Sequence, residues 1–377
     1  MLYTSFTPGP VVHFLPDFQV ESYRHRVSAS HQSIAGETTI LCSKRCLTPE
    51  GLDLLRRAGL PYAQNAEAFS DDGDYLDRLE SHISAGRRIA AQHTYDGKLV
   101  PKGALWIDPE IVTFLNSKAN LAELVPLGFA PRRDIIPKDH LLQASVRRTH
   151  PFVIKAVTTL STGSGGAVVI VRKEDDLEDA LSRFQSCAEL VVEEFVKFTQ
   201  SVCVNFATDG RSIEYLGSAE QIVEDNGHFL GNWFGEGAMV PSVVIDLGEE
   251  IMRNAVRRGY RGFGGFDIGI TPDGRPLAFD LNFRLCASTI PLQFLPSIQR
   301  RSKAARCGKS SGFSSSKPLH QVLPVLEVPV AAGMALPLLT YQDPVDGGSA
   351  VRLLLLGEDR DQVDRLEASL GTGFLQA

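Results

Sequence analysis

The chain is poor in cysteine and has no excess of basic residues. Six cysteines among 377 residues are too few for a disulfide scaffold, and Cys42 and Cys46 have no second pair at zinc spacing. Lysine and arginine number 38 against 45 acidic residues, so the net charge is −7. A clustered basic surface of the kind that binds nucleic acid is therefore not expected. These features predict a protein of a reducing, cytoplasmic compartment that binds no nucleic acid.

Uninterrupted hydrophobic runs are also missing. The first twenty residues lack a basic segment followed by an apolar one, so we expect no signal peptide. Residues 322–341 are apolar over the length of a membrane span, but they include three prolines and Glu327. Prolines and a carboxylate are poorly tolerated inside a spanning helix. We expect short strands and turns in this segment, and no membrane association.

Two common nucleotide-binding motifs are absent, the Gly-x-Gly-x-x-Gly fingerprint and the Walker A loop. Residues 1–105 nevertheless alternate between strand and helix patterns, with Thr48 and Pro49 marking one helix start. This alternation predicts a parallel sheet of Rossmann type. Gln92 and His93 fall at a strand end, the edge at which such sheets bind ligands, although a structural role is more common for a lone histidine.

The densest group of reactive side chains lies on a predicted hairpin, residues 264–284. Two apolar strands are joined by a Pro-Asp-Gly turn. Side chains two apart on a strand share a face, so Asp280, Asn282 and Arg284 project together, and a closed hairpin brings Asp267 beside them. Oxygen ligands with an arginine suit Mg²⁺ and a phosphoryl group. A hairpin with ordinary polar residues would show the same pattern.

Two lysines and a loop of small residues precede the hairpin. Lys118 lies in the first turn of a predicted helix, where it opposes the helix dipole and is suited to bind an anion. Lys155 ends a predicted strand, and residues 158–166, rich in Thr, Ser and Gly, follow it. Small residues allow backbone N–H groups to approach phosphate oxygens. A solvated lysine and a flexible hairpin are the alternatives.

Two adjacent acids, Glu193 and Glu194, end a buried strand and could present backbone groups and a carboxylate to an adenine and its ribose. Residues 223–237, rich in glycine, asparagine and aromatic residues, predict a loop that acts as a lid. Residues that could hold a substrate carboxylate are His228, Arg147 and Arg148.

The order of these features resembles the ATP-grasp superfamily of carboxylate–amine ligases. The resemblance rests on the two lysines, the small-residue loop, the Glu-Glu pair and the Asp … Asp-x-Asn-x-Arg set, and it covers about residues 105–295. The tail after residue 320 is most similar to the C-terminal extension of pheganomycin-type peptide ligases. The implied fold class is α/β, an α+β ATP-grasp fold with a Rossmann-like N-terminal domain.

The resemblance also implies a domain plan. A pre-ATP-grasp domain at 1–105 is followed by a two-lobed ATP-grasp region at 106–299, a linker or mobile loop at 300–319 and a small α/β extension at 320–377. Within the ATP-grasp region, the smaller nucleotide-clamping lobe spans about 120–200 and the metal-binding lobe about 201–299.

Cofactors and residue roles follow from the resemblance in the same way. ATP and two Mg²⁺ ions are implied, with Lys118 and Lys155 on the nucleotide phosphates and Arg284 at the acyl phosphate; Lys155 and Arg284 are the catalytic candidates. The metal ligands would be Asp267, Asp280 and Asn282. The loop over the β and γ phosphates would contain Ser161, Thr162, Gly163, Ser164, Gly165 and Gly166. The adenine and ribose would meet Glu193, Glu194, Phe195, Val196 and Gln200, adenine chiefly through the backbone.

Two positions depart from the family pattern. Gln200 stands where an acid usually binds the ribose, so we expect weaker ribose binding. Asp280 stands where the carboxylate that bridges the metals is often glutamate, and its shorter reach leaves open whether both ions bind equally well.

The implied activity is ATP-dependent ligation of a carboxylate to an amine through an acyl phosphate, with release of ADP and phosphate. We expect small-molecule carboxylate and amine substrates, amino acids or peptides of specialised metabolism, and a homodimer is left open. A kinase acting on a hydroxyl and a non-catalytic nucleotide-binding module are the alternatives.

Overall fold

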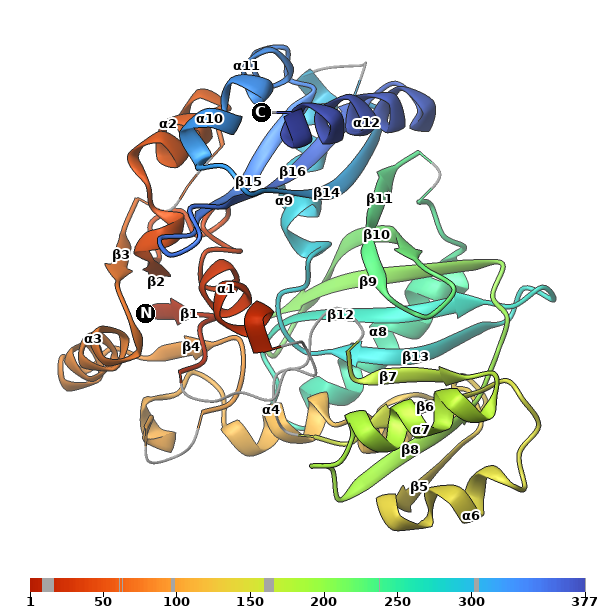
Figure 1. Ribbon diagram of the computed structural model, residues 1–377. Helices are drawn as coiled ribbons and strands as arrows, with labels where there is room; N and C mark the ends of the chain where they lie inside the picture. Colours follow the sequence, from red (N-terminus) through yellow and green to blue (C-terminus); the bar gives the residue numbers. More distant parts are fainter. Residues whose placement is uncertain are drawn as a thin grey trace.

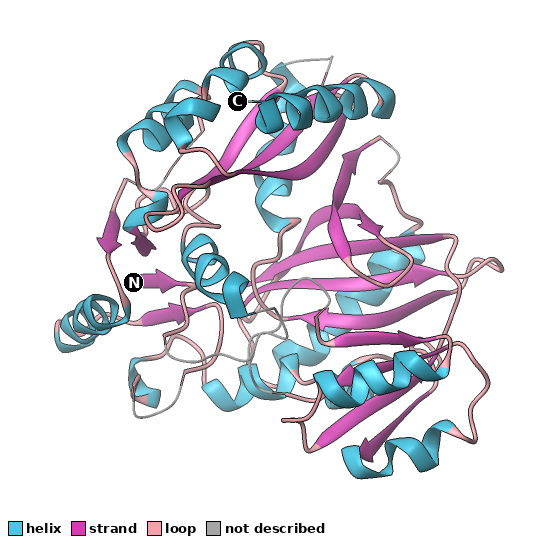
Figure 2. Cartoon of the chain, viewed as in Figure 1, coloured by secondary structure: helices cyan, strands magenta, loops and turns pink. Residues whose placement is uncertain are grey.

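The computed structural model describes residues 1–8, 17–60, 62, 64–95, 99–158, 166–236, 238–301 and 305–376. The described strands form one parallel sheet and two antiparallel sheets, with helices packed around them (Figures 1 and 2). No described helix is long and apolar enough to cross a membrane.

The N-terminal region forms a four-stranded parallel sheet in the order β3-β2-β1-β4, which confirms the predicted parallel sheet. Local sequence signals set its helices: the side chain of Thr48 accepts a hydrogen bond from the Gly51 N–H, and Pro49 follows at the first helical position. The elements in order are β1 (Leu2–Thr4), α1 (Asp17–Ser28), β2 (Thr39–Ser43), η1 (Lys44–Cys46), α2 (Pro49–Arg57), β3 (Ala66–Phe69), α3 (Asp72–Ser84) and β4 (Ile89–Ala91).

A second region holds a four-stranded antiparallel sheet in the order β5-β8-β6-β7, with α6 and α7 beside it (Figure 1). Its core includes Phe152, Ile154 and Phe184, all fully buried. The elements leading to and forming it are η2 (Lys102–Ala104), α4 (Pro109–Asn116), η3 (Lys118–Asn120), α5 (Leu121–Leu124), β5 (Arg133–Pro137), η4 (Lys138–His140), α6 (Leu141–Ser145), β6 (Phe152–Ala156), β7 (Val168–Val171), α7 (Glu174–Arg183) and β8 (Glu189–Glu194).

The largest sheet has eight strands in the order β13-β12-β9-β10-β11-β14-β16-β15, and each neighbouring pair is antiparallel. Helix α8 packs on the β9–β12 part through Val244, Leu247 and Ile251. The elements are β9 (Gln200–Thr208), β10 (Ile213–Val223), β11 (Phe229–Gly235), α8 (Ser242–Arg257), β12 (Gly262–Ile270), β13 (Pro276–Asn282), α9 (Thr289–Arg301), β14 (Cys307–Ser315), α10 (Leu319–Val322), α11 (Pro324–Ala331), β15 (Ala335–Gln342), β16 (Ser349–Gly357) and α12 (Arg360–Gln376).

The predicted linker at 300–319 is wrong, because Cys307–Ser315 is strand β14 between β11 and β16. Several of its polar side chains have partners within the protein. The Lys309 amine lies 2.8 Å from Asp364 and 2.5 Å from Glu367, both on α12. The Ser311 hydroxyl donates to Glu367 at 2.5 Å. These partners lie more than fifty residues away, so composition alone indicated a linker.

The tail is not a separate appendage either, since β15 and β16 extend the central sheet through β14. The predicted strand at 351–356 and the helix after it are confirmed as β16 and α12. The short strands and turns expected over 322–341 are only partly found. Helix α11 begins at Pro324, a position where proline is tolerated because its missing N–H would have no helical partner, and β15 follows.

The predicted lid at 223–237 is largely strand. Residues 229–235 form β11, which pairs with β10 and β14, so the loop between β10 and β11 is a short hairpin turn. Residues of this segment contact the neighbouring strand. The Asn232 N–H donates to the Ser310 hydroxyl at 3.0 Å, and Asn232 is buried. Glycine and asparagine in this segment therefore reflect close contact between strands.

The contact between β11 and β14 is tightest at Gly231, where an added Cβ would lie 2.4 Å from the backbone oxygen of Ser310. We expect Gly231→Ala to lower the free energy of unfolding by about 1–3 kcal/mol because the strands must separate. A thermal melt measures this. The control is Gly371→Ala in α12, where an added Cβ meets nothing within 4 Å and alanine favours the helix. Equal melting temperatures for Gly231→Ala and wild type would contradict the β11–β14 register.

Candidate active site

The hairpin of β12 and β13 brings the predicted metal ligands together. Asp267 lies directly opposite Asp280, and Gly265 lies opposite Asn282. The amide nitrogen of Asn282 is 3.4 Å from a carboxylate oxygen of Asp280. The two-residue period of a strand predicts that a closed hairpin places Asp267 beside Asp280 and Asn282. The strand register shows this placement.

Three cationic side chains surround Asp280. The amine of Lys118, from η3, forms an ion pair with its carboxylate. Burial alone would raise the pKa of Asp280, but the charges of Lys118, Lys155 and Arg284 hold it below its ordinary value. Residues from three separate segments thus concentrate positive charge at one carboxylate, an arrangement that can also receive phosphate oxygens.

Lys155 links the small sheet to the hairpin. It lies on β6, is almost fully buried, and its amine donates to the backbone oxygen of Phe279, on β13, at 2.6 Å. The same amine lies 2.7 Å from the carboxylate of Glu193. Burial lowers the pKa of Lys155, and Glu193 opposes that shift. The strand lysine predicted from sequence therefore reaches the metal-ligand hairpin directly.

Arg133 is a member of this cluster that the sequence did not indicate. Its guanidinium lies 2.8 Å from Glu193, and it donates to the Lys118 backbone oxygen at 3.2 Å. Glu193 is 2% exposed and so joins two buried cations. The Arg132-Arg133 pair at the start of β5 was a weak signal for it, because adjacent arginines usually lie in solvent.

The two acids at the end of β8 have protein partners for their side chains. Glu193 pairs with Lys155 and Arg133, and Glu194 lies 2.8 Å from the guanidinium of Arg132. Neither carboxylate is free to bind a nucleotide in this arrangement. The roles of Glu193 to Val196 and of Gln200, the first residue of β9, in adenine and ribose binding stay predictions, with the backbone as the part of residues 193–196 that would meet adenine.

The donor set fits Mg²⁺. Burial and the neighbouring carboxylate of Asp280 raise the pKa of Asp267 to about 7, so this carboxylate lies where a cation would be favourable. Within the described ranges there is no group of three or more His, Cys, Asp or Glu residues that could hold a metal ion. Two carboxylates and one amide leave coordination positions for phosphate and water, which is how Mg²⁺ commonly binds.

Arg284 follows β13 and is held by α4. The side-chain oxygen of Asn116 accepts from the Arg284 guanidinium at 3.2 Å and from the Phe283 N–H at 3.0 Å. The next residue, Leu285, accepts from the side chain of Gln92 at 2.5 Å. Gln92 lies just past β4, so the predicted ligand-binding edge of the N-terminal sheet does meet the site at Arg284.

Other predicted residues fall elsewhere. Ser161, Thr162, Gly163, Ser164 and Gly165 lie outside the described residues, and Gly166 is in a turn before β7. Arg148 forms an ion pair with Asp134 at the edge of the small sheet, and His228 is exposed in the β10–β11 turn. Among the described residues no contact connects Arg147, Arg148 or His228 to the site, so their roles in substrate binding stay predictions.

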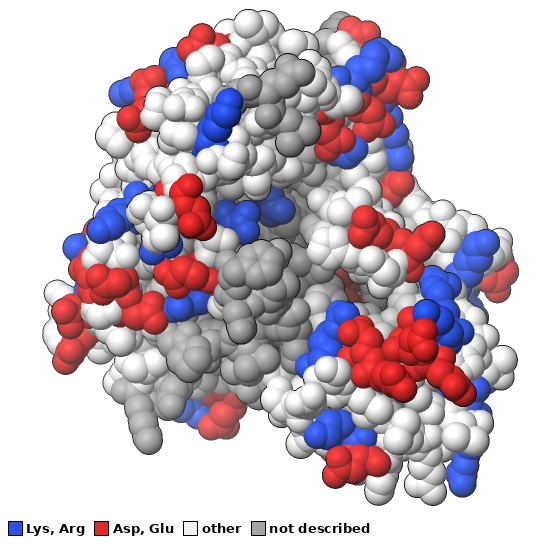
Figure 3. Space-filling model, viewed as in Figure 1, with Lys and Arg blue, Asp and Glu red and all other residues white. Residues whose placement is uncertain are grey.

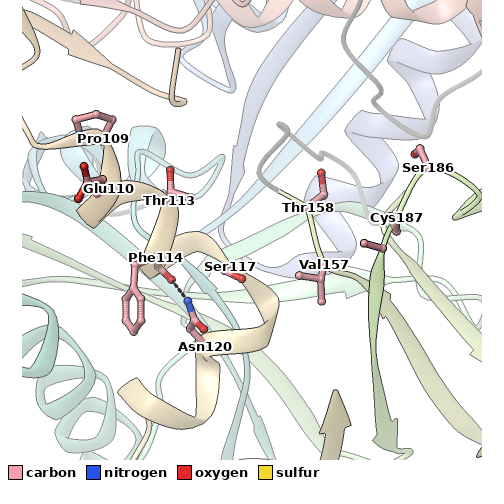
Figure 4. Close-up of a pocket in the computed structure, with 11 residues that line it drawn as sticks. Pro109, Glu110, Thr113, Phe114, Ser117, Asn120, Val157, Thr158, Ser186 and Cys187 are labelled. Atoms are coloured by element: carbon pink, nitrogen blue, oxygen red, sulfur yellow. Dashed lines mark hydrogen bonds between the residues drawn. The ribbon is translucent and has the colours of Figure 1, made fainter. Parts of the chain in front are cut away.

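A cavity of about 850 Å³ opens beside this cluster, between α4 and the small sheet. Figure 4 shows Ser117 and Asn120 on one side and Val157, Thr158 and Cys187 on the other. None of the metal-ligand candidates lines it. The cavity begins next to Lys118 and ends where β6 leads into the small-residue loop, so it adjoins the proposed phosphate site without containing the charged residues.

Comparison with protein families shows to which family the chain belongs. Residues 131–282 match the model described as "L-aspartate--L-methionine ligase, ATP grasp", and residues 18–113 match the model of the L-aspartate–L-methionine ligase N-terminal domain. Together they cover about two thirds of the chain. The chain belongs to the ATP-grasp ligases. The ATP-grasp match spans Lys155, Glu193 and the metal-ligand hairpin.

Solved structures share the fold of this ligase across nearly its whole length. An N5-carboxyaminoimidazole ribonucleotide synthase from Aspergillus clavatus, complexed with ATP, has a TM-score of 0.62 at 12% identity, covering 99% of this chain and 98% of that one. The Staphylococcus aureus synthetase complexed with ADP gives 0.61 at 11%, covering 98% and 96%. A phosphoribosylamine–glycine ligase from Thermotoga maritima gives 0.60 at 14%, covering 99% and 96%.

These findings confirm the α+β ATP-grasp fold and the class of reaction. The protein is an ATP-dependent carboxylate–amine ligase that forms a carbon–nitrogen bond, with ATP and Mg²⁺ as its cofactors and small molecules as its substrates. The finer likeness of the tail to pheganomycin-type peptide ligases stays a prediction, because the matching family models are those of another ligase.

Proposed function

We propose that the ligase joins an acidic amino acid, aspartate, to the amine of a second amino acid, methionine, and so makes a dipeptide. The observation that carries the chemistry is the convergence of Lys118, Lys155 and Arg284 on Asp280. The description of both matching family models supports the choice of substrates.

The first step activates the carboxylate. A carboxylate oxygen of the acid attacks the γ-phosphorus of ATP, the bond to the ADP oxygen breaks, and an acyl phosphate forms. Asp267, Asp280 and Asn282 would hold two Mg²⁺ ions, which neutralise phosphate charge when bound. Lys118 exchanges its ion pair with Asp280 for a phosphate oxygen, and Lys155 stays anchored by Glu193 beside it. The resemblance to ATP-grasp ligases implies that the 161–166 loop would cover the β and γ phosphates.

The second step forms the amide. The neutral amine attacks the acyl carbon, phosphate leaves, and the nitrogen releases a proton to solvent. Arg284 stabilises the tetrahedral oxyanion, and its guanidinium is positioned for this by Asn116. One such preorganised donor contributes on the order of 10²–10³ to the rate. Gln200 and the backbone of residues 193–196 would hold the ribose and adenine.

We place the reaction in the cytoplasm, with free amino acids as substrates. All six cysteines are free thiols, as in a reducing compartment. The described residues of the site need no second subunit, nucleic acid or membrane for the proposed reaction.

The test is Mg²⁺-dependent ADP release with aspartate, methionine, both, or neither. We expect rapid ADP release only with both amino acids. A mass spectrum of the dipeptide then identifies the bond that is formed. With aspartate alone, hydroxylamine should trap the acyl phosphate as a hydroxamate. ADP release with a hydroxyl compound and no amine would instead support a kinase, and ATP binding without release under any condition would support a binding module.

A further inference from the structure

Arg352 is the one charged residue on an otherwise apolar face of β16. Alternate residues of this strand face opposite sides: Val351, Leu353 and Leu355 pack in the core that includes α10–α12. On the other side, Ala350 packs against the N-terminal region, and Leu354 packs in the core that includes α9. Arg352 lies between these two buried positions; its side chain is accessible to solvent, although the protein around it removes part of its hydration and lowers its pKa. The two cores therefore leave a recess at Arg352.

The neighbouring strands keep this recess open. Gly312 of β14 lies directly opposite Arg352, and directly opposed side chains share a face of the sheet. A Cβ on Gly312 would meet nothing within 4 Å. On the other side, the pairing of β15 shifts register between Pro337 and Leu339, next to Arg352. A glycine and a register shift thus flank the guanidinium.

Helix α1 forms the opposite wall. Ala29, just after this helix, packs in the same core as Ala350 and Tyr341. Arg26 lies one turn before Ala29 and so shares its side of the helix. Arg352 lies next to Ala350 on the same face of β16, and Arg26 lies next to Ala29 on the same side of the helix. Two guanidinium groups thus face one recess, one from each end of the chain.

No acidic partner of either arginine is found among the described residues. Within the described part of the chain no carboxylate lies within 4.0 Å of Arg26 or Arg352, although Arg24 and Arg45 on the same side of the molecule both pair with Glu21. Figure 3 shows Lys and Arg side chains in a hollow on this face of the molecule. Two like charges are held together here, which is unfavourable unless an anion joins them.

The N-terminal region connects the recess to the reaction centre. Tyr3 packs against the core that contains Ala29 and Ala350, and its hydroxyl donates to the Gln92 side chain at 2.8 Å; Gln92 in turn contacts Leu285, the residue after Arg284. Tyr23, one turn before Arg26, responds to charges from both places: burial raises its pKa, and Arg284, Arg352 and Arg26 oppose the rise. Arg26 also contributes, after burial, to a lowered pKa of Arg352. An anion between Arg26 and Arg352 would therefore lie near the Arg284 end of the active site.

We propose that Arg26 and Arg352 bind the second carboxylate of the acidic substrate, the one that is not activated, while the other carboxylate lies at Arg284. This rests on the proposed function, and it gives the C-terminal strands a role in substrate selection. A guanidinium pair matches a carboxylate through charge-assisted hydrogen bonds, and a neutral amide in its place would leave both cations uncompensated. The two arginines therefore select an acidic amino acid over its amide.

The experiment compares Arg352→Gln and Arg26→Gln with wild type in ADP release. We expect KM for aspartate to rise about 10–100-fold in each, with KM for ATP within about 2-fold. The preference for aspartate over its two amides, asparagine and isoasparagine, should fall by a similar factor for the amide that alters the second carboxylate. Arg352→Lys should recover part of the affinity, because it keeps the charge.

The matched control is Arg365→Gln, an exposed arginine of α12 in the same part of the fold. It should leave all constants unchanged. Thermal melts report folding, and if one glutamine variant fails to fold, the other tests the same recess from the opposite wall. Aspartate-dependent ADP release with unchanged KM and unchanged amide preference in both glutamine variants overturns the proposal. Absence of aspartate-dependent release in wild type counts instead against the proposed function.

Discussion

Asp280→Asn is expected to lower the rate of dipeptide formation by about 10³-fold. The amide keeps the shape of the side chain but removes the charge that balances Lys118, Lys155 and Arg284, and it weakens the binding of Mg²⁺. ADP release at saturating ATP and Mg²⁺ measures the loss. The fold should persist, because the substitution also removes the repulsion between Asp280 and Asp267, directly opposite on β12.

A matched control lies on the same hairpin. Asp273 is in the turn between β12 and β13, is exposed, and accepts a hydrogen bond from the Thr271 hydroxyl. Asp273→Asn should keep the rate within about 2-fold of wild type, since a turn residue contributes only locally. The assignment of Asp280 fails if Asp280→Asn retains more than about a tenth of the wild-type rate with a normal melting curve.

Glu193→Gln is expected to have the largest effect on stability. The side chain of Glu193 is 2% exposed, and its two partners are also buried, with Lys155 at 6% and Arg133 at 7%. Removing the shared carboxylate leaves two buried cations facing each other, and breaking a buried pair typically costs about 3–5 kcal/mol. We expect a loss of this order in the small sheet, together with weaker ATP binding because Lys155 loses its anchor.

The adjacent residue provides the control. Glu194 also pairs with an arginine, but its side chain is 31% exposed and that of Arg132 is 90% exposed. Glu194→Gln should therefore change stability by at most about 1 kcal/mol. Hydrogen exchange of β5, β6 and β8, read beside a thermal melt, separates loss of the small sheet from global unfolding. Equal destabilisation by the two substitutions would show that burial of Glu193 does not decide the effect.

The site was predictable where its geometry is local. The turn between β12 and β13 and the alternation of residues along β13 are properties of neighbouring residues, so the positions of Asp267, Asp280 and Asn282 could be read from the sequence. Lys155 could be found as well, because a charged residue at the end of an apolar strand is conspicuous. Arg133 could not be predicted, because Glu193, the carboxylate that pairs with it in the interior, is sixty residues away in the sequence.

The errors share a physical cause. The segment around Lys309 resembles a linker until Glu367 and Asp364 are placed beside it, and the segment around Gly231 resembles a flexible lid until Ser310 is packed against it. In both segments, small and polar residues make contacts with elements that are distant in the sequence, helix α12 in the first and strand β14 in the second. Sequence patterns indicate the period of a helix or strand and the chemistry of its turns. The residues that contact such an element depend on which surfaces the fold brings together.

The sequence by itself determined the class of reaction, because two lysines, a small-residue loop and an acidic hairpin, each a local pattern, follow one another in the order that resembles the ATP-grasp ligases. Only the tertiary structure decided that β14 joins the C-terminal strands to the central sheet, and that β16, which carries Arg352, packs against the end of α1 through Ala350 and Ala29. Strand pairing and helix packing bring together residues hundreds of positions apart, and the free energy of that assembly comes from surfaces that no single stretch of sequence contains.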